Sequence, residues 1–413
     1  MSEPGIVIIG AGEAGARAAL GLRMRQYRGP IALIGAEPGL PYERPPLSKA
    51  VMAAPTLAAP PVTLDEAAIA RNEIDYRAGI QVAAIDRAGR VVVLADGQRL
   101  PYQRLLIAAG ATPRRLAVPG AEAVSYLRSA EDARLLRARL QPGTRLAIIG
   151  GGLIGLEIAA CAIGLGCQVT IIEQAAAILM RAVPPALAAM IEARHRAAGV
   201  QFRLGAAIAR IEARGNGHAV ILAAGEVLPC DVILAGIGVV PETNLAAAAG
   251  LALENGIRVD ASLATGDPDI FAAGDCCSFP HPLYEGRRMR LESWRNAQDQ
   301  GNQAAANLLG AAAPFAAVPW FWSDQYEFCL QIAGLPQFGA AIIAREIGPG
   351  AKFLFHLDAD GRLVAASALG PLGAIARDIK IAELLIAQRA HPAPEILAAP
   401  DARLKSLLRQ AAA

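Results

Sequence analysis

Residues 146–157 read LAIIGGGLIGLE. The four apolar residues are typical of a buried strand, the glycines of a tight turn, and the last residues of a helix start. Gly150, Gly152 and Gly155 occupy the positions of a G-x-G-x-x-G motif. The first glycine permits the turn, the second lets the backbone approach a pyrophosphate, and the third lets helix and strand pack closely. The N–H groups and dipole of the helix start then hold the anion.

A second copy of this pattern, IVIIGAGEAG, lies near the N-terminus and contains Gly10, Gly12 and Gly15. Each copy is followed by another apolar strand that leads to an acidic residue, Glu37 in the first case and Glu173 in the second. A carboxylate at this place can accept hydrogen bonds from a ribose 2′-OH. One motif alone is a weak signal, but two complete units predict two dinucleotide sites and electron transfer between them.

The composition restricts the class of protein. A chain of 413 residues is long enough for two or three domains, and its net charge of +2 gives no reason to expect nucleic-acid binding. Met1–Pro4 leads directly into a strand, and no uninterrupted apolar run reaches membrane-spanning length, so we expect neither a signal peptide nor a membrane segment. The six cysteines form no C-x-x-C pair and the five histidines are scattered, which predicts a reduced, cytoplasmic protein without a metal site.

Motifs along nearly the whole chain follow one order: GAGEAG, PYERPPLSK, AAGATPR, GGGLIGLE, GIGVVPE, TGDPDIFAAGD, ESWRNAQDQG and PWFWSDQ. In this order the chain resembles the FAD-dependent, NADH-linked ferredoxin reductases of bacterial monooxygenase and Rieske dioxygenase systems, within the glutathione-reductase-like flavoprotein superfamily. PYERPPLSK and PWFWSDQ are the motifs most specific to this branch. The resemblance implies an α/β fold with two Rossmann-like dinucleotide-binding domains and a C-terminal α+β domain. The implied FAD domain covers residues 1–112 and 241–318, split by an inserted NAD domain at 113–240, and the C-terminal domain covers 319–413.

The resemblance also implies where FAD would bind. Gly10, Gly12 and Gly15 would hold its pyrophosphate, and Glu37 its adenosine ribose. Asp275 would bind the ribityl or phosphate region, and Lys49 would lie beside the isoalloxazine. Further cofactor contacts implied by these motifs are Ala14, Arg44, Pro45, Ala109, Gly110, Arg128, Gly274, Glu292, Ser293 and Trp294.

For NADH, the co-substrate, the resemblance implies a site on the second unit. Gly150, Gly152 and Gly155 would hold the dinucleotide and Glu173 its ribose. Arg181 matches a basic position near the dinucleotide, and Trp320 matches an aromatic residue beside flavin and nicotinamide. Ile154, Gly236, Ile237 and Gly238 complete the implied contacts.

Glu157 lies two residues after Gly155, in the first turns of the second motif's helix. It is either a structural carboxylate at a helix start or a residue that approaches the nicotinamide and pairs with Lys49. With Lys49 and Trp320 it forms our set of catalytic candidates. Hydride transfer between the two cofactors needs no protein acid, so these residues would supply local charge and stacking.

The electron acceptor is the remaining question. No cysteine accompanies Ser48 and Lys49, and a disulfide between the adjacent Cys276 and Cys277 would close a strained ring. We therefore expect an enzyme that passes single electrons to a [2Fe–2S] ferredoxin and so supplies a cytochrome P450 or Rieske-type oxygenase. Its partners would include neither nucleic acid nor membrane, and the chain would be a monomer or weak dimer. The alternatives are an NADH oxidase or disulfide-type reductase, and a flavin redox sensor similar to apoptosis-inducing factors.

Arg287, Arg288 and Arg290 form the densest basic run of the chain. This run is either a solvated loop or a landing patch for an acidic ferredoxin, whose approach such charges would accelerate.

Overall fold

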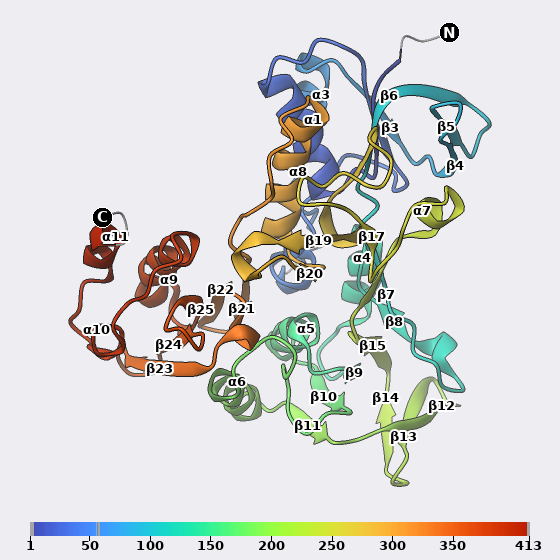
Figure 1. The fold of residues 1–413 in the computed structure, drawn as a ribbon. Helices are drawn as coiled ribbons and strands as arrows, with labels where there is room; N and C mark the ends of the chain where they lie inside the picture. The colour runs from blue at the N-terminus through green and yellow to red at the C-terminus, as the bar shows by residue number, and fades with distance from the viewer. Residues whose placement is uncertain (1–3, 55, 57, 411–413) are drawn as a thin grey trace. The chain divides into compact units, whose positions relative to one another are not determined.

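The computed structural model describes residues 4–54, 56 and 58–410. They form two compact units, each assembled from separate parts of the chain (Figure 1). The first unit comprises Met1–Glu43, Pro60–Thr112 and Val239–Ala317, and the second comprises Arg44–Ala59, Pro113–Gly238 and Val318–Ala413. The predicted fold class is confirmed: the fold is α/β, with two Rossmann-like regions and a C-terminal α+β region. The three-domain boundaries given above stay a prediction.

The first unit is built on a sheet whose parallel strands follow the order β3-β2-β1-β6, with β18 also paired to β6. The early part of β6 also pairs antiparallel with β5, which pairs with β4, and a hairpin at Asp96-Gly97 joins β5 to β6. Every residue of β1 is buried, as its apolar sequence predicts. The strands of this unit are β1 (Gly5–Ile9), β2 (Ile31–Gly35), β3 (Ile74–Ala78), β4 (Val82–Asp86), β5 (Val91–Leu94), β6 (Arg99–Ile107), β18 (Ile270–Ala272) and the small sheet β17 (Ile257–Arg258), β19 (Cys277–His281) and β20 (Arg287–Met289).

Two helices of the first unit, α1 (Glu13–Met24) and α8 (Trp294–Leu308), lie side by side (Figure 1). Their small residues allow the close approach, because a Cβ added to Gly301 would lie 2.4 Å from the carbonyl oxygen of Ala14. A Cβ on Gly21 would similarly lie 2.9 Å from the Cβ of Ala305. The close packing fixes the start of α8 beside the first glycine turn. The other helices of this unit are α3 (Glu66–Arg71), α7 (Asn244–Ala248) and the 3-10 turns η3 (Gly274–Cys276) and η4 (Pro282–Tyr284).

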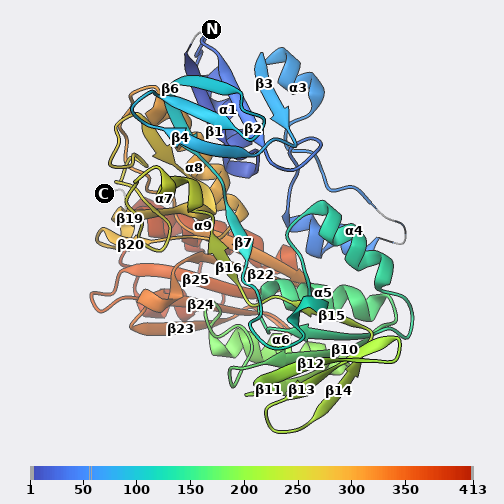
Figure 2. The same cartoon turned by 90° about the vertical axis from the view of Figure 1, so that its right-hand side faces the viewer.

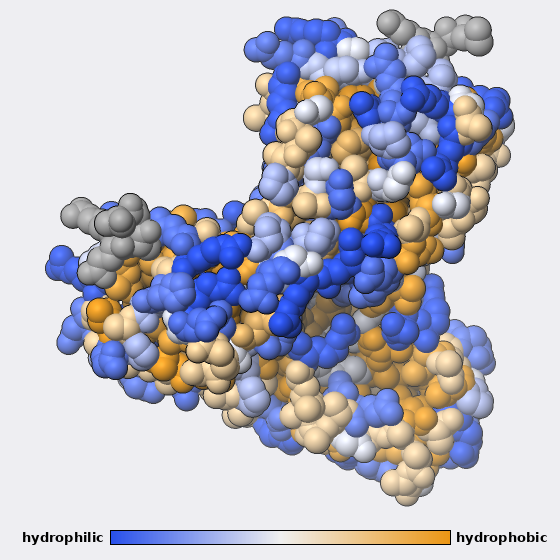
Figure 3. Space-filling model, viewed as in Figure 1, coloured by the Kyte–Doolittle hydropathy of each residue, from blue (hydrophilic) through white to orange (hydrophobic). Residues whose placement is uncertain are grey.

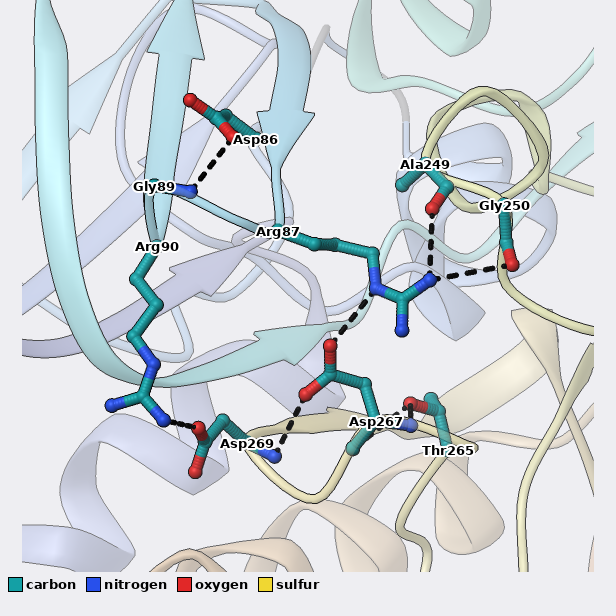
Figure 4. A network of polar contacts seen from close by, with 9 residues as sticks. All are labelled: Asp86, Arg87, Gly89, Arg90, Ala249, Gly250, Thr265, Asp267 and Asp269. Carbon is teal, nitrogen blue, oxygen red and sulfur yellow. Dashed lines mark hydrogen bonds and ion pairs between the residues drawn. The ribbon is translucent and has the colours of Figure 1, made fainter.

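A network of charged residues anchors the segment that leads into β18 (Figure 4). Arg87 donates from Nε to Asp267 Oδ2 at 2.9 Å, and Arg90 forms an ion pair with Asp269. Asp267 in turn accepts a 3.1 Å hydrogen bond from the backbone N–H of Asp269. β18 begins one residue after Asp269, so these contacts fix the start of the strand. They thereby also fix the place of Gly274 and Asp275, which follow its end.

The second unit contains a parallel sheet in the order β11-β10-β9-β15-β8 and an antiparallel sheet of β12, β13 and β14 (Figure 2). The apolar stretch 232–241 is divided by Gly236–Gly238 into β15 and β16 (Val239–Pro241). β16 pairs with β7 (Ala111–Pro113), and Val239–Pro241 and Ala111–Thr112 belong to the first unit. The remaining elements are β8 (Ser125–Tyr126), β9 (Arg145–Ile149), β10 (Gln168–Glu173), β11 (Gln201–Leu204), β12 (Ile208–Arg214), β13 (Gly217–Leu222), β14 (Val227–Cys230), β15 (Val232–Ala235), η2 (Ala121–Ala123), α4 (Ala130–Arg139), α5 (Leu153–Gly164) and α6 (Pro185–Ala197).

The C-terminal region of the second unit is an antiparallel sheet in the order β21-β22-β25-β24-β23. A hairpin at Asp360-Gly361 joins β24 to β25, and the helix after β25 is α9, which packs on β22 and β25. The elements are β21 (Trp320–Gln325), β22 (Phe328–Gly334), η5 (Pro336–Phe338), β23 (Ala341–Glu346), β24 (Lys352–Leu357), β25 (Leu363–Gly370), α9 (Leu372–Ala387), α10 (Pro394–Ala398), η6 (Leu404–Ser406) and α11 (Leu407–Gln410).

One local prediction was wrong. The three prolines of residues 41–46 predict an extended loop without helix, yet Pro45–Ser48 forms the 3-10 turn η1, followed by α2 (Ala50–Ala53). Pro45 stands at the first helical position, where the N–H group that proline lacks would have no partner within the helix. The proline therefore favours the turn rather than forbidding it, and the turn places Ser48 and Lys49 at its end.

No helix within residues 4–54, 56 and 58–410 is long and apolar enough to cross a membrane. On the face drawn in Figure 3, hydrophilic residues are interspersed with apolar ones over both units.

Candidate functional site

The first glycine turn follows β1 and leads into α1. Gly10 has φ +102°, and a Cβ there would lie 2.2 Å from the carbonyl oxygen of Ala108. A Cβ on Gly15 would lie 1.9 Å from the carbonyl oxygen of Gly10, so both glycines are required by the protein's own backbone. Gly12 differs, because a Cβ built on it meets no heavy atom of the described residues within 4 Å. The space in front of Gly12 is therefore open to a ligand.

The helix that begins at this turn has no side-chain cap from the part of the chain that the structure describes. By contrast, α3, α4 and α8 are capped by Asp65, Ser129 and Ser293. The first N–H groups of an uncapped helix, which include those near Ala14, need an acceptor from outside the helix. An open cradle with free donors fits the pyrophosphate of a dinucleotide such as FAD.

The acidic residues near the first turn are held by the protein. Glu13 accepts hydrogen bonds from Arg17 at 2.7 Å, Gln298 at 3.2 Å and Thr63 at 3.4 Å, so its carboxylate is engaged away from the phosphate cradle. Glu37 follows β2 and accepts a 2.5 Å hydrogen bond from the hydroxyl of Tyr42. A carboxylate has about four acceptor positions, so Glu37 retains capacity for ribose hydroxyls.

The other predicted FAD contacts of the first unit converge on the same sheet edge. Ile9 pairs with Ile107, and Ile107 pairs with Ala272, so Gly10, Ala109-Gly110 and Gly274-Asp275 all follow the carboxyl ends of neighbouring parallel strands. The backbone N–H of Gly274 donates to Gln300 Oε1 at 2.7 Å, which fixes this turn to α8. The remaining three predicted contacts lie at the start of α8, where Glu292 pairs with Arg290, Ser293 is the N-cap and Trp294 is the first helical residue.

The second glycine turn, between β9 and α5, has the same geometry. Gly150 has φ +102°, and a Cβ on it would lie 2.6 Å from the carbonyl oxygen of Gly236. A Cβ on Gly155 would lie 2.5 Å from the carbonyl oxygen of Gly150. Gly152 supplies no side chain at the N-cap, and among the described residues none replaces it. The second turn therefore also fits a dinucleotide pyrophosphate.

The predicted NAD contacts around this turn lie together. Gly236–Gly238 borders Gly150, and Arg181 Nη1 lies 3.3 Å from the Cβ position of Gly238. Ile154, the second residue of α5, is 44% exposed. The structure thus assembles the glycine turn, Arg181 and the 236–238 loop in one place.

Glu173, at the end of β10, has a second role that the sequence did not reveal. Its Oε2 accepts a 2.7 Å hydrogen bond from the N–H of Gly151, and its Oε1 accepts a 2.8 Å bond from the N–H of Ala175. These bonds hold the carboxylate beside the glycine turn and leave further acceptor positions for a ribose.

A buried ion pair joins two of the catalytic candidates. Lys49 Nζ lies 2.9 Å from Glu157 Oε2, which confirms the predicted pairing, and Glu157 is only 4% exposed. The same carboxylate accepts hydrogen bonds from Ser48 Oγ at 2.5 Å and from Ser323 Oγ at 2.6 Å. The Glu157 carboxylate on α5 therefore binds two serine hydroxyls by hydrogen bonds and also pairs with the charge of Lys49.

One aromatic ring lies beside the lysine of this pair, and a second ring stacks on the first. Lys49 Nζ lies 5.4 Å from the centroid of the Trp322 ring, and Trp320 stacks on Trp322 with centroids 5.3 Å apart.

Arg44 donates to the carbonyl oxygen of Arg128 at 2.6 Å, so these two predicted contacts also adjoin. Pro45 follows at the start of η1.

The thiols are poorly suited to redox chemistry. All six cysteines lie in the described part of the chain and are free. Burial raises the pKa of Cys276 to about 11 and that of Cys277 well above its usual value. Burial, together with the nearby carboxylate of Glu157, raises the pKa of Cys161 to about 11. Because the thiolate is the reactive form, these cysteines are inert near neutral pH.

The described residues contain no cluster of three or more His, Cys, Asp or Glu that could hold a metal ion.

Arg288 and Arg290 of the basic run are held by neighbouring groups of the protein. Arg288 donates from Nη1 to the carbonyl oxygens of Val259 and Ser278, both at 2.8 Å. Arg290 lies 2.7 Å from Glu292, with only 8% of its side chain exposed. These contacts favour the structural interpretation of the run over a landing patch.

Two Rossmann-like regions, each with an uncapped helix behind a glycine turn, define a class of proteins that carry two dinucleotide-binding folds in one chain. Within this class the chain belongs to the pyridine nucleotide-disulphide oxidoreductase family, which it matches over residues 4–301, and residues 320–408 match the reductase C-terminal family.

Similar proteins cover the whole length of the chain. It is 43% identical over 411 residues to the anthranilate 1,2-dioxygenase system ferredoxin–NAD(+) reductase component of Burkholderia cepacia, covering 99% of this chain and 100% of that protein. It is 39% identical to putidaredoxin reductase of Pseudomonas putida, covering 97% of this chain and 98% of that protein. The crystal structure of the covalent putidaredoxin reductase–putidaredoxin complex superposes with a TM-score of 0.93 at 36% identity and covers 100% of both chains.

Proposed function

We propose that this chain is an NADH-dependent ferredoxin reductase with FAD as its cofactor. NADH is the co-substrate, and the electrons pass singly to a [2Fe–2S] ferredoxin that supplies an oxygenase. The observation that carries the proposal is the presence of two open dinucleotide cradles in a chain in which burial raises the pKa of Cys161, Cys276 and Cys277. Full-length similarity to proteins named ferredoxin reductases supports the same conclusion.

The residues of the first unit would bind FAD, which when bound accepts a hydride from NADH and releases electrons one at a time. The first N–H groups of α1 would donate to the pyrophosphate, and Glu37 would accept from the ribose. Gly274, whose N–H donates to Gln300, and the adjacent Asp275 would border the cofactor at the same sheet edge.

In the second unit, the start of α5 and Arg181 would bind the NADH pyrophosphate, and Glu173 its ribose. We assign the Lys49–Glu157 pair and Trp320 to the place where the nicotinamide reacts. There the ion pair would fix the local charge, and Trp320, backed by Trp322, would order the stacking of the rings.

A disulfide-type reductase is the less favoured candidate, because it requires a reactive thiol and the pKa of the cysteines described above is raised by burial. We propose the cytoplasm as the compartment, since free thiols are kept reduced there.

The test is electron transfer to an iron–sulfur protein. We expect the purified yellow protein, mixed with NADH and candidate [2Fe–2S] ferredoxins from its own genome, to bleach the iron–sulfur absorption of at least one of them at a catalytic rate. A long-lived reduced flavin–NAD complex without transfer to any ferredoxin would instead favour the sensor function. Rapid NADH consumption by oxygen alone would favour an NADH oxidase.

We expect a preference for NADH over NADPH of at least about tenfold in kcat/KM, which corresponds to about 1.4 kcal/mol. A 2′-phosphate would bring negative charge next to the Glu173 carboxylate, and two like charges 4 Å apart repel by roughly 4 kcal/mol at an effective dielectric constant of 20. Glu173→Gln should narrow the preference, because it removes the charge and keeps one of the two acceptor oxygens, which can serve Gly151 or Ala175 but not both. Glu173→Ala is less informative, since it leaves the N–H groups of Gly151 and Ala175 without their acceptor.

The matched control is Glu192→Gln, which removes a carboxylate from the surface of α6 in the same unit. Steady-state kinetics with both nucleotides should show an unchanged preference in this variant. Equal use of NADH and NADPH by the unmodified protein would refute the ribose role of Glu173.

A further inference from the structure

A continuous chain of hydrogen bonds runs through the second unit from Glu157 to Tyr326. Ser323 Oγ lies 2.6 Å from Glu157 Oε1, and Gln325 Nε2 lies 3.0 Å from Ser323 Oγ. Gln325 Oε1 lies 2.8 Å from His195 Nε2, and the Tyr326 hydroxyl lies 3.1 Å from His195 Nδ1. The chain links α5, β21 and α6 and ends in the turn between β21 and β22.

The chemistry of these groups permits only one direction of donation. Glu157 accepts from Lys49 and Ser48 as a carboxylate, so Ser323 must donate its single hydroxyl proton to it. Ser323 can then only accept from Gln325, which therefore presents its N–H to the serine and its carbonyl oxygen to His195. A flipped amide would place two acceptors against each other at Ser323. The direction of hydrogen-bond donation from Gln325 through Ser323 to Glu157 is therefore fixed by the Glu157 carboxylate, which can only accept.

The same argument fixes the tautomer of the histidine. His195 Nε2 faces the Gln325 carbonyl oxygen and must carry the proton, which leaves Nδ1 to accept from the Tyr326 hydroxyl. Burial lowers the pKa of His195, which is 0% exposed, and the neighbouring charge of Arg194 lowers it further against the opposing effect of the Gln325 hydrogen bond. The imidazole is thus neutral near pH 7, as a one-way chain requires.

The turn that carries Tyr326 is conformationally unfavourable for a tyrosine. Its φ of 55° lies in the left-handed region, where a hairpin turn usually places glycine or asparagine. The Arg194 guanidinium lies 4.1 Å from the centroid of the Tyr326 ring and also pairs with Glu327 at 2.8 Å. Tyr326 is therefore a bulky residue in an unfavourable backbone conformation that contacts Arg194 on one side and His195 on the other. Local stability alone does not select such a residue at a turn.

We infer that Ser323, Gln325, His195 and Tyr326 are positioning residues for the Lys49–Glu157 pair. Their donors all point toward Glu157 and hold Oε1, so that Oε2 stays turned to Lys49 and Ser48. The inference rests on the proposed function, in which this pair lies where the nicotinamide reacts. It adds to the machinery of that site four residues from β21, α6 and the turn after β21, none of which needs to contact a cofactor.

The first test separates positioning from simple structural support. Ser323→Ala removes the hydroxyl, and we expect the limiting rate of flavin reduction by NADH to fall about tenfold, with FAD content unchanged and the Kd for NADH altered less than about twofold. Ser323→Thr restores the hydroxyl and should recover the rate to within about twofold. The matched control is Ser367→Ala, because Ser367 is a buried serine of the same sheet that faces a different histidine, His356, at 3.1 Å. Equal rates in Ser323→Ala and Ser367→Ala would overturn the inference.

The second test detects the chain of hydrogen bonds directly and does not measure enzyme turnover. In protein labelled with ¹⁵N-histidine, NMR should show His195 as the neutral Nε2–H tautomer near pH 7. In Ser323→Ala the Gln325 amide loses the acceptor that orients it, so the His195 signals should move toward a mixture of tautomers. Ser367→Ala should leave them unchanged. A wild-type His195 protonated on Nδ1 would overturn the inference.

The two failures are distinguishable. If no ferredoxin is reduced but NADH still reduces the flavin and both tests give the expected results, the acceptor assigned above is wrong and the positioning chain stands. If ferredoxin is reduced normally while Ser323→Ala behaves like Ser367→Ala, the proposed function stands and the positioning chain is wrong.

Discussion

Replacing Gly12 by valine should give a folded protein that retains less than about one tenth of the normal FAD, a loss of at least roughly 1.4 kcal/mol in binding. A Cβ at this position meets no heavy atom of the described residues within 4 Å, so the protein itself has room for the side chain. That room is the open space in front of the α1 donors, where the pyrophosphate would lie. The measurement is the flavin absorbance per chain after purification, with circular dichroism to establish folding.

Two further variants sharpen this prediction. Gly266→Val is the matched control, because Gly266 belongs to the same unit and its Cβ position is equally clear of the described atoms. It should retain its FAD. Gly152→Val changes the corresponding glycine of the second turn, whose nearest neighbour would be Gly236 O at 3.7 Å. It should keep FAD and lose affinity for NADH. A folded, fully yellow Gly12→Val protein would contradict the assignment of FAD to the first turn.

The second large effect concerns stability in acid. Burial lowers the pKa of His281 from 6.5 to about 4. Its Nδ1 accepts the N–H of Leu283 at 3.3 Å, so its Nε2 carries the proton that binds the carbonyl oxygen of Ala317 at 3.0 Å. A second proton would place an N–H group against the N–H of Leu283. Between pH 6.5 and 4 the unfolded chain therefore binds a proton that the folded protein does not, and stability falls as the pH falls.

The size of this effect can be measured with one variant. His281→Asn keeps a side-chain acceptor for Leu283 and cannot be protonated. Between pH 7 and pH 4.5 the wild type should lose about 2–3 kcal/mol more in the free energy of unfolding than His281→Asn does. Urea unfolding of both proteins at the two pH values measures the difference, in which the titration of carboxylates cancels. His356, whose pKa is also lowered to about 4 by burial, remains in both proteins. Identical pH dependence of the two proteins would show that His281 is not the group responsible.

The glycine turns illustrate what the sequence can predict. Gly10 and Gly150, the strands before them and the acids at the next strand ends are local features with a fixed spacing, so their geometry follows from a short stretch of chain. The Lys49–Glu157 pair was also predictable, but only through the resemblance, since the two residues are far apart in the sequence. Its roles at the nicotinamide, like those of the other predicted site residues, stay predictions.

The contacts of Ser323, Gln325 and His195 could not be predicted from the sequence. The alternation of WFWSDQ indicates that Ser323 and Gln325 share one face of β21 and that Trp320 and Trp322 share the other. It does not indicate that the polar face is buried against Glu157 and His195, because those contacts depend on how α5 and α6 pack. No motif in the sequence singles out His195.

The grouping of Arg44–Ala59 with the second unit has a consequence during synthesis. Ser48 leaves the ribosome 109 residues before its partner Glu157, and Ser323 follows Glu157 by another 166 residues. At roughly 5–20 residues per second, Arg44–Ala59 waits on the order of 5–20 s for Glu157, and the carboxylate then waits longer still for Ser323. The Lys49–Glu157 pair can therefore form only after Glu157 has been made, and the hydrogen bond from Ser323 can be added only after a further 166 residues.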